Sequence, residues 1–294
     1  MIGRVTSQII QRSTLSNLQT NLSSISRLQG QLSSGKKVDK ASDDPAHAAQ
    51  LMSLRGEQTR NSQYERNVQD ATSWLSTTDS ALQTASTTLR RVRDLVIQGG
   101  NTSLPQVAKD ALAIEIKELR DGMLQTANTT FMGRTVFAGT SAAGNAFDTT
   151  TYQWTGNTDG RVDRVVADGA DVRVDTDGTS AFGNGDASVF ALFDKIVSTL
   201  QSGGNPTQYL DEIDGFSTNI RSELASVGAR QLTVDNASTR LSESDLDLTA
   251  QVSGIEDIDL AQVILQLQSQ TVAYQASLGA AAKVLTPSLM EFLR

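Results

Sequence analysis

The sequence predicts a mainly α-helical protein: an elongated coiled-coil rod of long N- and C-terminal helices with a small β-rich inserted domain. Apolar residues recur at alternating steps of four and three in both halves of the chain, a spacing typical of helices that pack side by side. Aromatic residues make up only 5% of the 294 positions, which favours slender helical packing over a thick globular interior. A glycine-rich stretch in the middle interrupts the helical pattern and predicts the insertion.

The N-terminal arm is expected to be helical from near its start. Apolar residues keep helical spacing there, at Leu15, Leu18, Leu22, Ile25, Leu28 and Leu32. A longer helix is expected after Asp44-Pro45, because Asp caps helix N-termini and proline is tolerated at the first helical position. Its unbroken stripe is Val68, Ala71, Leu75, Thr78, Leu82, Ala85, Leu89, Val92 and Val96. One helix over residues 46–98 would extend for about 80 Å.

Glycine and proline mark a turn after this helix. Gly99-Gly100-Asn101 is expected to end it, and Leu104-Pro105 to open the next helix shortly afterwards. The next helix carries a shorter stripe at Leu112, Ile116, Leu119 and Met123. The two helices should therefore form a helical hairpin.

The helical period disappears between Gly133 and Gly185. Short pieces at 150–154, 161–167 and 171–175 are rich in β-forming residues, and Asp168-Gly169 between the last two is a hairpin signal. We therefore expect a small β insertion in this part of the chain.

Helical patterns return in the C-terminal half. Asn205-Pro206 and Thr286-Pro287 are capped helix starts, and Pro287 should end or kink the last helix at residues 285–286. One stripe comprises Ile213, Phe216, Ile220, Glu223, Val227, Arg230, Val234, Ala237 and Leu241, and the other Leu260, Ile264, Leu267, Thr271, Tyr274, Leu278, Ala281 and Leu285. Because the insertion separates two helical arms that must pack together, the termini should share one end.

These patterns divide the chain into three expected regions. Residues 1–43 and 256–294 form a terminal coiled coil, the inner core of an assembly. Residues 44–137 and 190–255 form a helical rod domain. Residues 138–189 form the small β-rich domain.

Composition excludes several classes of partner. The net charge is −8, and Lys36-Lys37 is the longest Lys/Arg run, so nucleic acid is not an expected partner. Membrane insertion is not expected, because no segment approaches the roughly 20 apolar residues that a spanning helix needs. The N-terminus has no apolar signal-peptide region, and the absence of cysteine excludes disulfides and thiolate chemistry.

No residue pattern predicts catalysis, a cofactor or a metal site. Asp43-Asp44 directly precedes Pro45, where carboxylates act as helix caps and partners of the helix dipole. His47 is the only histidine, so neither a zinc motif nor a serine nucleophile has the partners it needs. We expect His47 to be a solvated helix residue and the protein not to be an enzyme.

Three segments together resemble the bacterial flagellin superfamily. The first runs from Gln31 to Asp44 and contains Ser33-Ser34-Gly35-Lys36 and Ser42-Asp43-Asp44, with Pro45 directly after it, where family members end one helix and begin the next. The second is the helix end Leu89–Gln98. The third runs from Asp257-Ile258-Asp259 to Leu278, and only residues 140–188 lack a family pattern.

The resemblance implies a structural subunit of the bacterial flagellum that serves motility. Within the superfamily, Phe131–Thr140 and Leu289–Leu293 resemble members that join hook to filament. Such members polymerise through their terminal helices into rings or helical arrays. The implied partners are copies of the chain itself, the other hook-associated junction protein, flagellin and a flagellar export chaperone. The implied location is the flagellum, reached by secretion without a cleaved signal peptide.

The resemblance also implies the residues that function. The assembly interface of the terminal helices would comprise Leu15, Leu18, Leu22, Ile25, Leu32, Leu260, Ile264, Leu267, Tyr274, Leu278 and Leu285. In flagellins the helix end that matches Arg91 and Leu95 is recognised by an animal innate-immune receptor.

Alternatives remain within and outside this class. The chain could be flagellin, the filament subunit itself. A cytoplasmic coiled-coil signalling protein would also show long heptads, but it should have membrane spans or a helical tip in place of the β insertion. A secreted enzyme on a flagellar rod would need its catalytic groups in residues 140–188, which contain neither His nor Cys.

Overall fold

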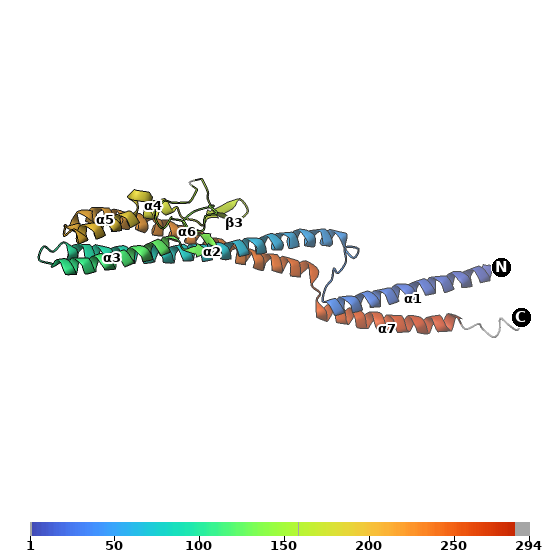
Figure 1. The fold of residues 1–294 in the computed structure, drawn as a ribbon. Helices are drawn as coiled ribbons and strands as arrows, with labels where there is room; N and C mark the ends of the chain where they lie inside the picture. The colour runs from blue at the N-terminus through green and yellow to red at the C-terminus, as the bar shows by residue number, and fades with distance from the viewer. Residues whose placement is uncertain (1, 158, 286–294) are drawn as a thin grey trace. The chain divides into compact units, whose positions relative to one another are not determined.

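The computed structural model describes residues 2–157 and 159–285, and the side chains of residue 9 and of residues 12–282 except 158. The elements are α1 (Ile2–Ser34), α2 (Pro45–Gly99), α3 (Gln106–Ala127), β1 (Thr130–Phe131), β2 (Arg134–Thr135), β3 (Asp163–Ala167), β4 (Ala170–Arg173), α4 (Gly178–Phe182), η1 (Gly185–Ala187), α5 (Val189–Gln201), η2 (Pro206–Tyr209), α6 (Leu210–Glu256) and α7 (Leu260–Leu285). Figure 1 shows this order along the chain. The prediction of a mainly α fold with long terminal helices and a small strand-containing insertion is confirmed.

The chain divides into two compact units. One comprises Met1–Thr59 with Asp245–Arg294, and the other Arg60–Ser244. The first unit pairs the two ends of the chain, because α1 and α7 pack side by side. The three expected regions have different boundaries from these two units and stay a prediction.

The long stripe predicted on α2 forms the core of the second unit. All nine of its residues are buried, from Val68 at 4% exposure to Val96 at 0%. Together they form one cluster with the buried stripes of α3, α5 and α6, which include Ile116, Ile196 and Val227. The four-three spacing thus identified the packed face of the helix correctly, because only that face can meet several neighbours at once.

The predicted helix boundaries at glycine and proline are confirmed for α2, α3 and η2. The helix α2 begins at Pro45 and ends at Gly99, α3 begins directly after Pro105, and Asn205 caps η2 by accepting a hydrogen bond from the Thr207 amide at 3.1 Å. Arg91 on α2 bonds Glu115 on α3 at 2.7 Å between Nε and Oε1, so the two helices form the expected hairpin. The expectations for Thr286 and Pro287 lie outside the described residues.

The insertion contains fewer strands than the sequence predicts. The strands β3 and β4 pair antiparallel around Asp168-Gly169, where Gly169 has a φ of +68°, so the predicted hairpin is confirmed. The prediction of a strand at 150–154 is wrong. The Asp148 carboxylate accepts hydrogen bonds from the amides of Thr150 and Thr151 at 2.9 and 2.7 Å, which folds this piece into a turn.

Aromatic rings fill the centre of the insertion. Phe182 meets Phe137 edge to face, and Phe147 meets Phe190 in the same way, with centroids 5.2 and 5.3 Å apart. All four rings are completely buried. The few aromatic residues of the chain are thus concentrated where irregular backbone, rather than paired helices, must enclose a core.

Truncation of the α2 stripe should destabilise the second unit. Leu82→Ala removes a completely buried side chain and should lower the free energy of unfolding by roughly 2–5 kcal/mol. Gln83→Ala changes the neighbouring exposed residue and should alter it by less than about 0.5 kcal/mol. Urea unfolding followed by circular dichroism measures both. Equal effects of the two substitutions would show that the stripe does not hold the core.

Candidate assembly interface

The seam between α1 and α7 uses residues at alternating steps of four and three on both helices. These residues are buried or half-buried in the pair. They are Leu18, Asn21, Ile25, Leu28 and Leu32 on α1, and Val263, Leu267, Gln270, Tyr274, Ser277 and Ala281 on α7. This spacing keeps one face of each helix against the other along the whole seam.

A hydrogen-bonded pair of polar side chains lies in the mostly apolar seam. The Gln270 side-chain amide donates a hydrogen bond to Asn21 Oδ1 at 3.1 Å, joining residues 249 positions apart. A polar residue in a coiled-coil seam favours the one register in which its partner lies opposite, at a cost in stability. This pair therefore favours one alignment of α1 along α7.

The predicted interface residues fall into two groups in the structure. Leu18, Ile25, Leu32, Leu267 and Tyr274 lie half-buried in the seam. The others with described side chains stay exposed: Leu15, Leu22, Leu260, Ile264 and Leu278. The side chain of Leu285 lies outside the described residues. Val263, Asn21 and Gln270 were not predicted as seam positions, although they follow the same four-three steps.

Four of the exposed residues form a second row beside the seam, which we call the flanking row. Each of them directly follows a position on the four-three steps of its helix, at the next residue along the chain. Leu15 and Leu22 on α1 are 58% and 53% exposed, and Ile264 and Leu278 on α7 are 40% and 43% exposed. The flanking row therefore remains uncovered after α1 and α7 have paired.

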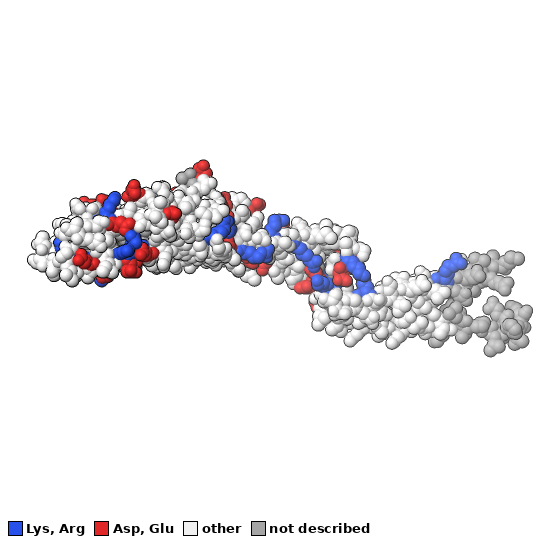
Figure 2. Space-filling model, in the orientation of Figure 1, with Lys and Arg blue, Asp and Glu red and all other residues white. Residues whose placement is uncertain are grey.

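The surface around the flanking row carries almost no charge. Residues 13–26 of α1 and 260–282 of α7 contain no Asp, Glu, Lys or Arg. Figure 2 shows this part of the pair almost entirely white on the visible face. Exposed apolar residues without interspersed charge are typical of surfaces that bind another protein.

The family-type segment after α1 forms a structured link. The helix ends at Ser34, and Gly35 has a φ of +73°, the left-handed conformation that glycine adopts without strain. Its amide donates to the Gln31 carbonyl at 2.8 Å, and the Lys36 amide donates to Ser34 Oγ at 3.2 Å. The Ser-Ser-Gly-Lys sequence thus ends one helix and turns the chain toward the next.

The start of α2 is capped as the sequence predicts. Asp44 Oδ1 accepts hydrogen bonds from the amides of Ala46 and His47, both at 3.1 Å. His47 Nδ1 lies 2.5 Å from Asp44 Oδ2, and this contact lowers the pKa of the Asp44 carboxyl. The Asp43 carboxylate accepts from the Lys40 amide at 3.0 Å within the link. The Asp44 carboxylate therefore caps the start of α2, and the Asp43 carboxylate binds the backbone of the link.

Glu256 connects this link to the junction between α6 and α7. Its buried carboxylate lies 2.5 Å from Lys36 Nζ and accepts two hydrogen bonds from Arg55, each at 2.8 Å. Its carbonyl accepts from the Lys37 amide at 2.5 Å, and the Ile258 amide donates to the Gly35 carbonyl at 3.1 Å. The Lys36 ammonium, followed by Arg55, lowers the pKa of the Glu256 carboxyl. We call this arrangement the Glu256 bridge.

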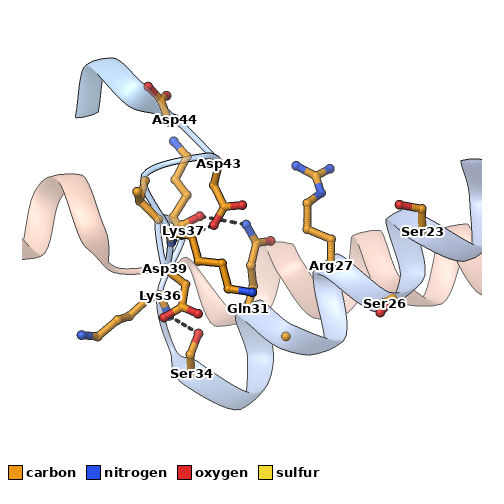
Figure 3. A pocket seen from close by; sticks show the side chains of 13 residues that line it. Ser23, Ser26, Arg27, Gln31, Ser34, Lys36, Lys37, Asp39, Asp43 and Asp44 are labelled. Atoms are coloured by element: carbon orange, nitrogen blue, oxygen red, sulfur yellow. Dashed lines mark hydrogen bonds between the residues drawn. The ribbon is translucent and has the colours of Figure 1, made fainter. Parts of the chain in front are cut away.

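A polar pocket of about 640 Å³ lies between α1 and the link. Figure 3 shows Arg27 and Gln31 of α1 on one side of it and Lys37 and Asp43 of the link on the other. Gln31 donates from its side-chain amide to the Lys37 carbonyl at 3.1 Å, which holds the link beside α1. The lining contains charges of both signs and no histidine.

The predicted receptor-recognised residues differ in exposure. Arg91 is half-exposed and paired with Glu115, whereas Leu95 is 1% exposed within the α2 core. Recognition by a receptor stays a prediction, and in this conformation Arg91 is the accessible member of the pair. Within the described parts of the chain, no group of His, Asp and Glu side chains could hold a metal ion, and no helix combines the length and hydropathy needed to cross a membrane.

Loss of the Glu256 charge should loosen the Glu256 bridge. Glu256→Gln weakens hydrogen bonds to two cations and should lower the local opening free energy by roughly 2 kcal/mol. Hydrogen exchange at the Lys37 and Ile258 amides measures this opening. Asp247→Asn, an exposed change on the same helix, is the control and should leave both exchange rates unchanged.

The same bridge should weaken in acid. Because the folded-state pKa of Glu256 lies below the ordinary glutamate value of about 4.3, its stabilisation is complete above that value. The stabilisation is lost as the pH falls through the folded-state pKa. Glu256→Gln should lack most of this acid effect, and an identical acid response in both proteins would contradict the assignment.

The sequence and the fold of the chain are similar to those of known flagellar proteins. Residues 5–142 match the bacterial flagellin N-terminal helical region, and residues 210–293 match the bacterial flagellin C-terminal helical region. The chain is similar to a flagellin of Bacillus subtilis, with 29% identity over 93% of each chain. It is also similar to flagellar hook-associated protein 3 of Salmonella typhimurium, with 24% identity over 93% of this chain and 94% of that protein.

A solved structure shares the fold. The flagellar junction protein FlgL from Legionella pneumophila superimposes with a TM-score of 0.58 and 17% identity, covering 71% of this chain and 100% of that one. The two matching helical regions together span most of the sequence, and the segment without a match, 143–209, contains most of the insertion. The chain belongs to the bacterial flagellin superfamily.

Proposed function

We propose that this chain is a structural, non-enzymatic subunit of the bacterial flagellum that joins hook to filament and polymerises through α1 and α7. The observation that carries the proposal is the flanking row, an apolar surface without charged neighbours on helices of flagellin type. The chain has 25 Lys and Arg residues and 33 Asp and Glu residues, yet none lies within residues 13–26 or 260–282. The surface is suited to contact with further copies of the chain.

The energetics of the flanking row favour repeated contacts over a single strong one. Covering the exposed half of a leucine or isoleucine side chain contributes about 1 kcal/mol. The four residues of the row are each about half exposed, so one neighbour gains a few kcal/mol. Such a gain is modest for an isolated pair but accumulates when each subunit touches several others in a ring or helical array.

Four observations support a junction subunit over a filament subunit. The relative from Salmonella typhimurium, a hook-associated protein 3, matches nearly the full length of both chains. The fold neighbour from Legionella pneumophila is a junction protein. Residues 131–140 resemble junction members, and the insertion is small.

Flagellin is the second candidate, and a specific observation favours it. The Bacillus subtilis flagellin is 29% identical over 93% of each chain, so the family-type helices alone do not separate the two roles. Both roles imply location in the flagellum. Export through the flagellar secretion channel without a cleaved signal, an export chaperone, and contacts with flagellin and the other hook-associated junction protein belong to the proposal.

A charge in the flanking row should block assembly. Leu22→Asp places a carboxylate at a position that must lose water on assembly, and it should raise the concentration needed for assembly at least tenfold. Thr20→Asp adds the same charge to an exposed polar position on the side of α1 away from the row and should change it little. Sedimentation velocity of the purified proteins measures the size of the assemblies. Equal assembly of Leu22→Asp and the unmodified chain would refute a role of the row.

Disruption of the gene should separate the two candidate roles. If the chain is the junction subunit, its loss should release filament monomers into the medium from cells with intact hooks. If it is flagellin, its loss should leave no filament protein to release. Electron microscopy of the cells and electrophoresis of the medium provide the two measurements.

A further inference from the structure

The β1–β2 hairpin presents an exposed methionine in an unusual backbone conformation. Phe131 pairs with Arg134, which leaves Met132 and Gly133 as the two-residue turn. Their φ angles are +49° and +78°, and Met132 is 82% exposed. A two-residue hairpin turn commonly takes positive φ angles at both positions, which glycine or asparagine adopts more readily than methionine. The hairpin therefore explains the backbone conformation, whereas the fold of one copy leaves the Met132 side chain exposed.

The base of the β1–β2 hairpin packs against α2. The Phe131 ring meets the buried Trp74 ring of α2 with centroids 5.5 Å apart. Thr135 on β2 is buried, and the Val136 amide donates to the Thr129 carbonyl at 3.1 Å. The fold thus fixes the base of the turn and directs Met132 into solvent. Because the backbone of the turn is already fixed, the conformational entropy lost on binding is mainly that of the methionine side chain itself.

The same unit contains a groove that fits such a side chain. The groove has a volume of about 440 Å³ and lies between α2, α6 and the β3–β4 hairpin. Its lining includes the buried residues Val166 and Leu241 and two small residues, Ala170 and Ala237. The lining also contains six polar or charged residues: Asn61, Asp168, Thr233, Asn236, Arg240 and Ser244. Methionine is flexible and polarizable, so it adapts to such a mixed apolar and polar surface.

Charges beside the turn and on the groove rim are complementary. Arg134 follows the turn, and Asp168 lies on the rim at the tip of the β3–β4 hairpin. Both are exposed, and neither has an ion-pair partner among the residues that the structure describes. Arg240 on α6 also lines the groove, so the lining carries one charge of each sign. Pairing of Arg134 with Asp168 requires the turn to approach the groove from the β3–β4 hairpin.

We propose that Met132 of one copy inserts into this groove of a second copy, with Arg134 of the first facing Asp168 of the second. Because Met132 is 82% exposed in its own chain, it does not occupy its own groove. A contact between two different patches is head to tail, and its repetition generates a ring or a helix. The inference rests on the proposed function, which requires the chain to self-associate, and it adds a contact outside the terminal helices.

Cysteine pairing tests the contact directly, because the chain has no cysteine of its own. Met132→Cys is mixed with Ala237→Cys in one sample and with Ser238→Cys in another, assembled and oxidised. Ser238 directly follows Ala237 on α6, is exposed, and does not line the groove. We expect at least tenfold more disulfide-linked heterodimer from the first mixture than from the second. Mixing single variants ensures that every heterodimer joins two copies.

The other possible results would refute either the groove contact alone or the proposed function together with it. Equal yields in the two mixtures, or Met132→Cys pairing mainly with itself, would refute the groove as the site. Failure of the unmodified chain to assemble, seen by sedimentation, would refute the proposed function and this contact with it. Assembly without selective cross-linking refutes the contact alone.

Two further variants separate a contact role from a structural one. Met132→Gly relieves the strained turn, so the melting temperature of the monomer should stay equal or rise while assembly weakens several-fold. Arg134→Asp should also weaken assembly, and adding Asp168→Arg in the same chain should restore it. A fall in melting temperature with unchanged assembly, or no restoration by the double exchange, would contradict the proposal.

Discussion

The pairing of α1 with α7 is the contact on which the flanking row and the proposed assembly depend. It joins the two ends of the chain, as the hydrogen bond between Asn21 and Gln270 across 249 positions shows. Contacts so far apart in sequence carry a large loop-closure cost unless the intervening chain is already compact. The core of the Arg60–Ser244 unit supplies that compactness, because its stripes bury completely against one another.

The two units bury their apolar residues to different extents. In the Arg60–Ser244 unit, the α2 stripe has several neighbours and reaches exposures near zero. In the terminal unit each helix has one described partner, so the seam residues are half-buried and the flanking row is exposed. Two helices can cover only one narrow stripe of each other. Full burial of the terminal helices therefore requires additional helices, which further copies of the chain can provide.

The Glu256 bridge stabilises the point where regular structure is interrupted twice. The link after α1 and the junction between α6 and α7 both leave backbone groups without helical partners. The bridge satisfies several of these groups at once, through the Lys37 amide, the Gly35 carbonyl and the Ile258 amide. The buried carboxylate adds two cationic side chains to the same place. A local network of this kind favours one geometry of the link over alternatives.

The insertion and the β1–β2 hairpin are stabilised differently from the long helices. Their backbone is irregular, and their core depends on interlocking aromatic rings rather than on helix periodicity. Both elements place exposed groups, Met132 and Asp168, at the tips of tight turns. Turn tips on a rigid base can carry specific contacts without disturbing the helical packing beneath them.

The sequence determined the helices, because local signals fix them. Capping by Asp44 and Asn205, glycine at the ends of α1 and α2, and the four-three stripe of α2 each act within a few residues and appear in the structure as predicted. The helix-to-helix segment from Ser33 to Pro45 also carried the family resemblance, since its turn needs glycine and its cap needs a short polar side chain. The hairpin at Asp168-Gly169 was predictable for the same local reason.

Only the tertiary structure decided which faces of the helices meet and which stay open. On α7 two overlapping four-three series fit the sequence, and the structure selects the one through Val263 and Gln270 while leaving Ile264 and Leu278 outside. The choice depends on the partner helix, which pattern alone does not contain. The role of Glu256 and the groove beside Ala237 likewise arise between segments distant in the chain. Their physical basis is long-range contact, so no local spacing could have specified them.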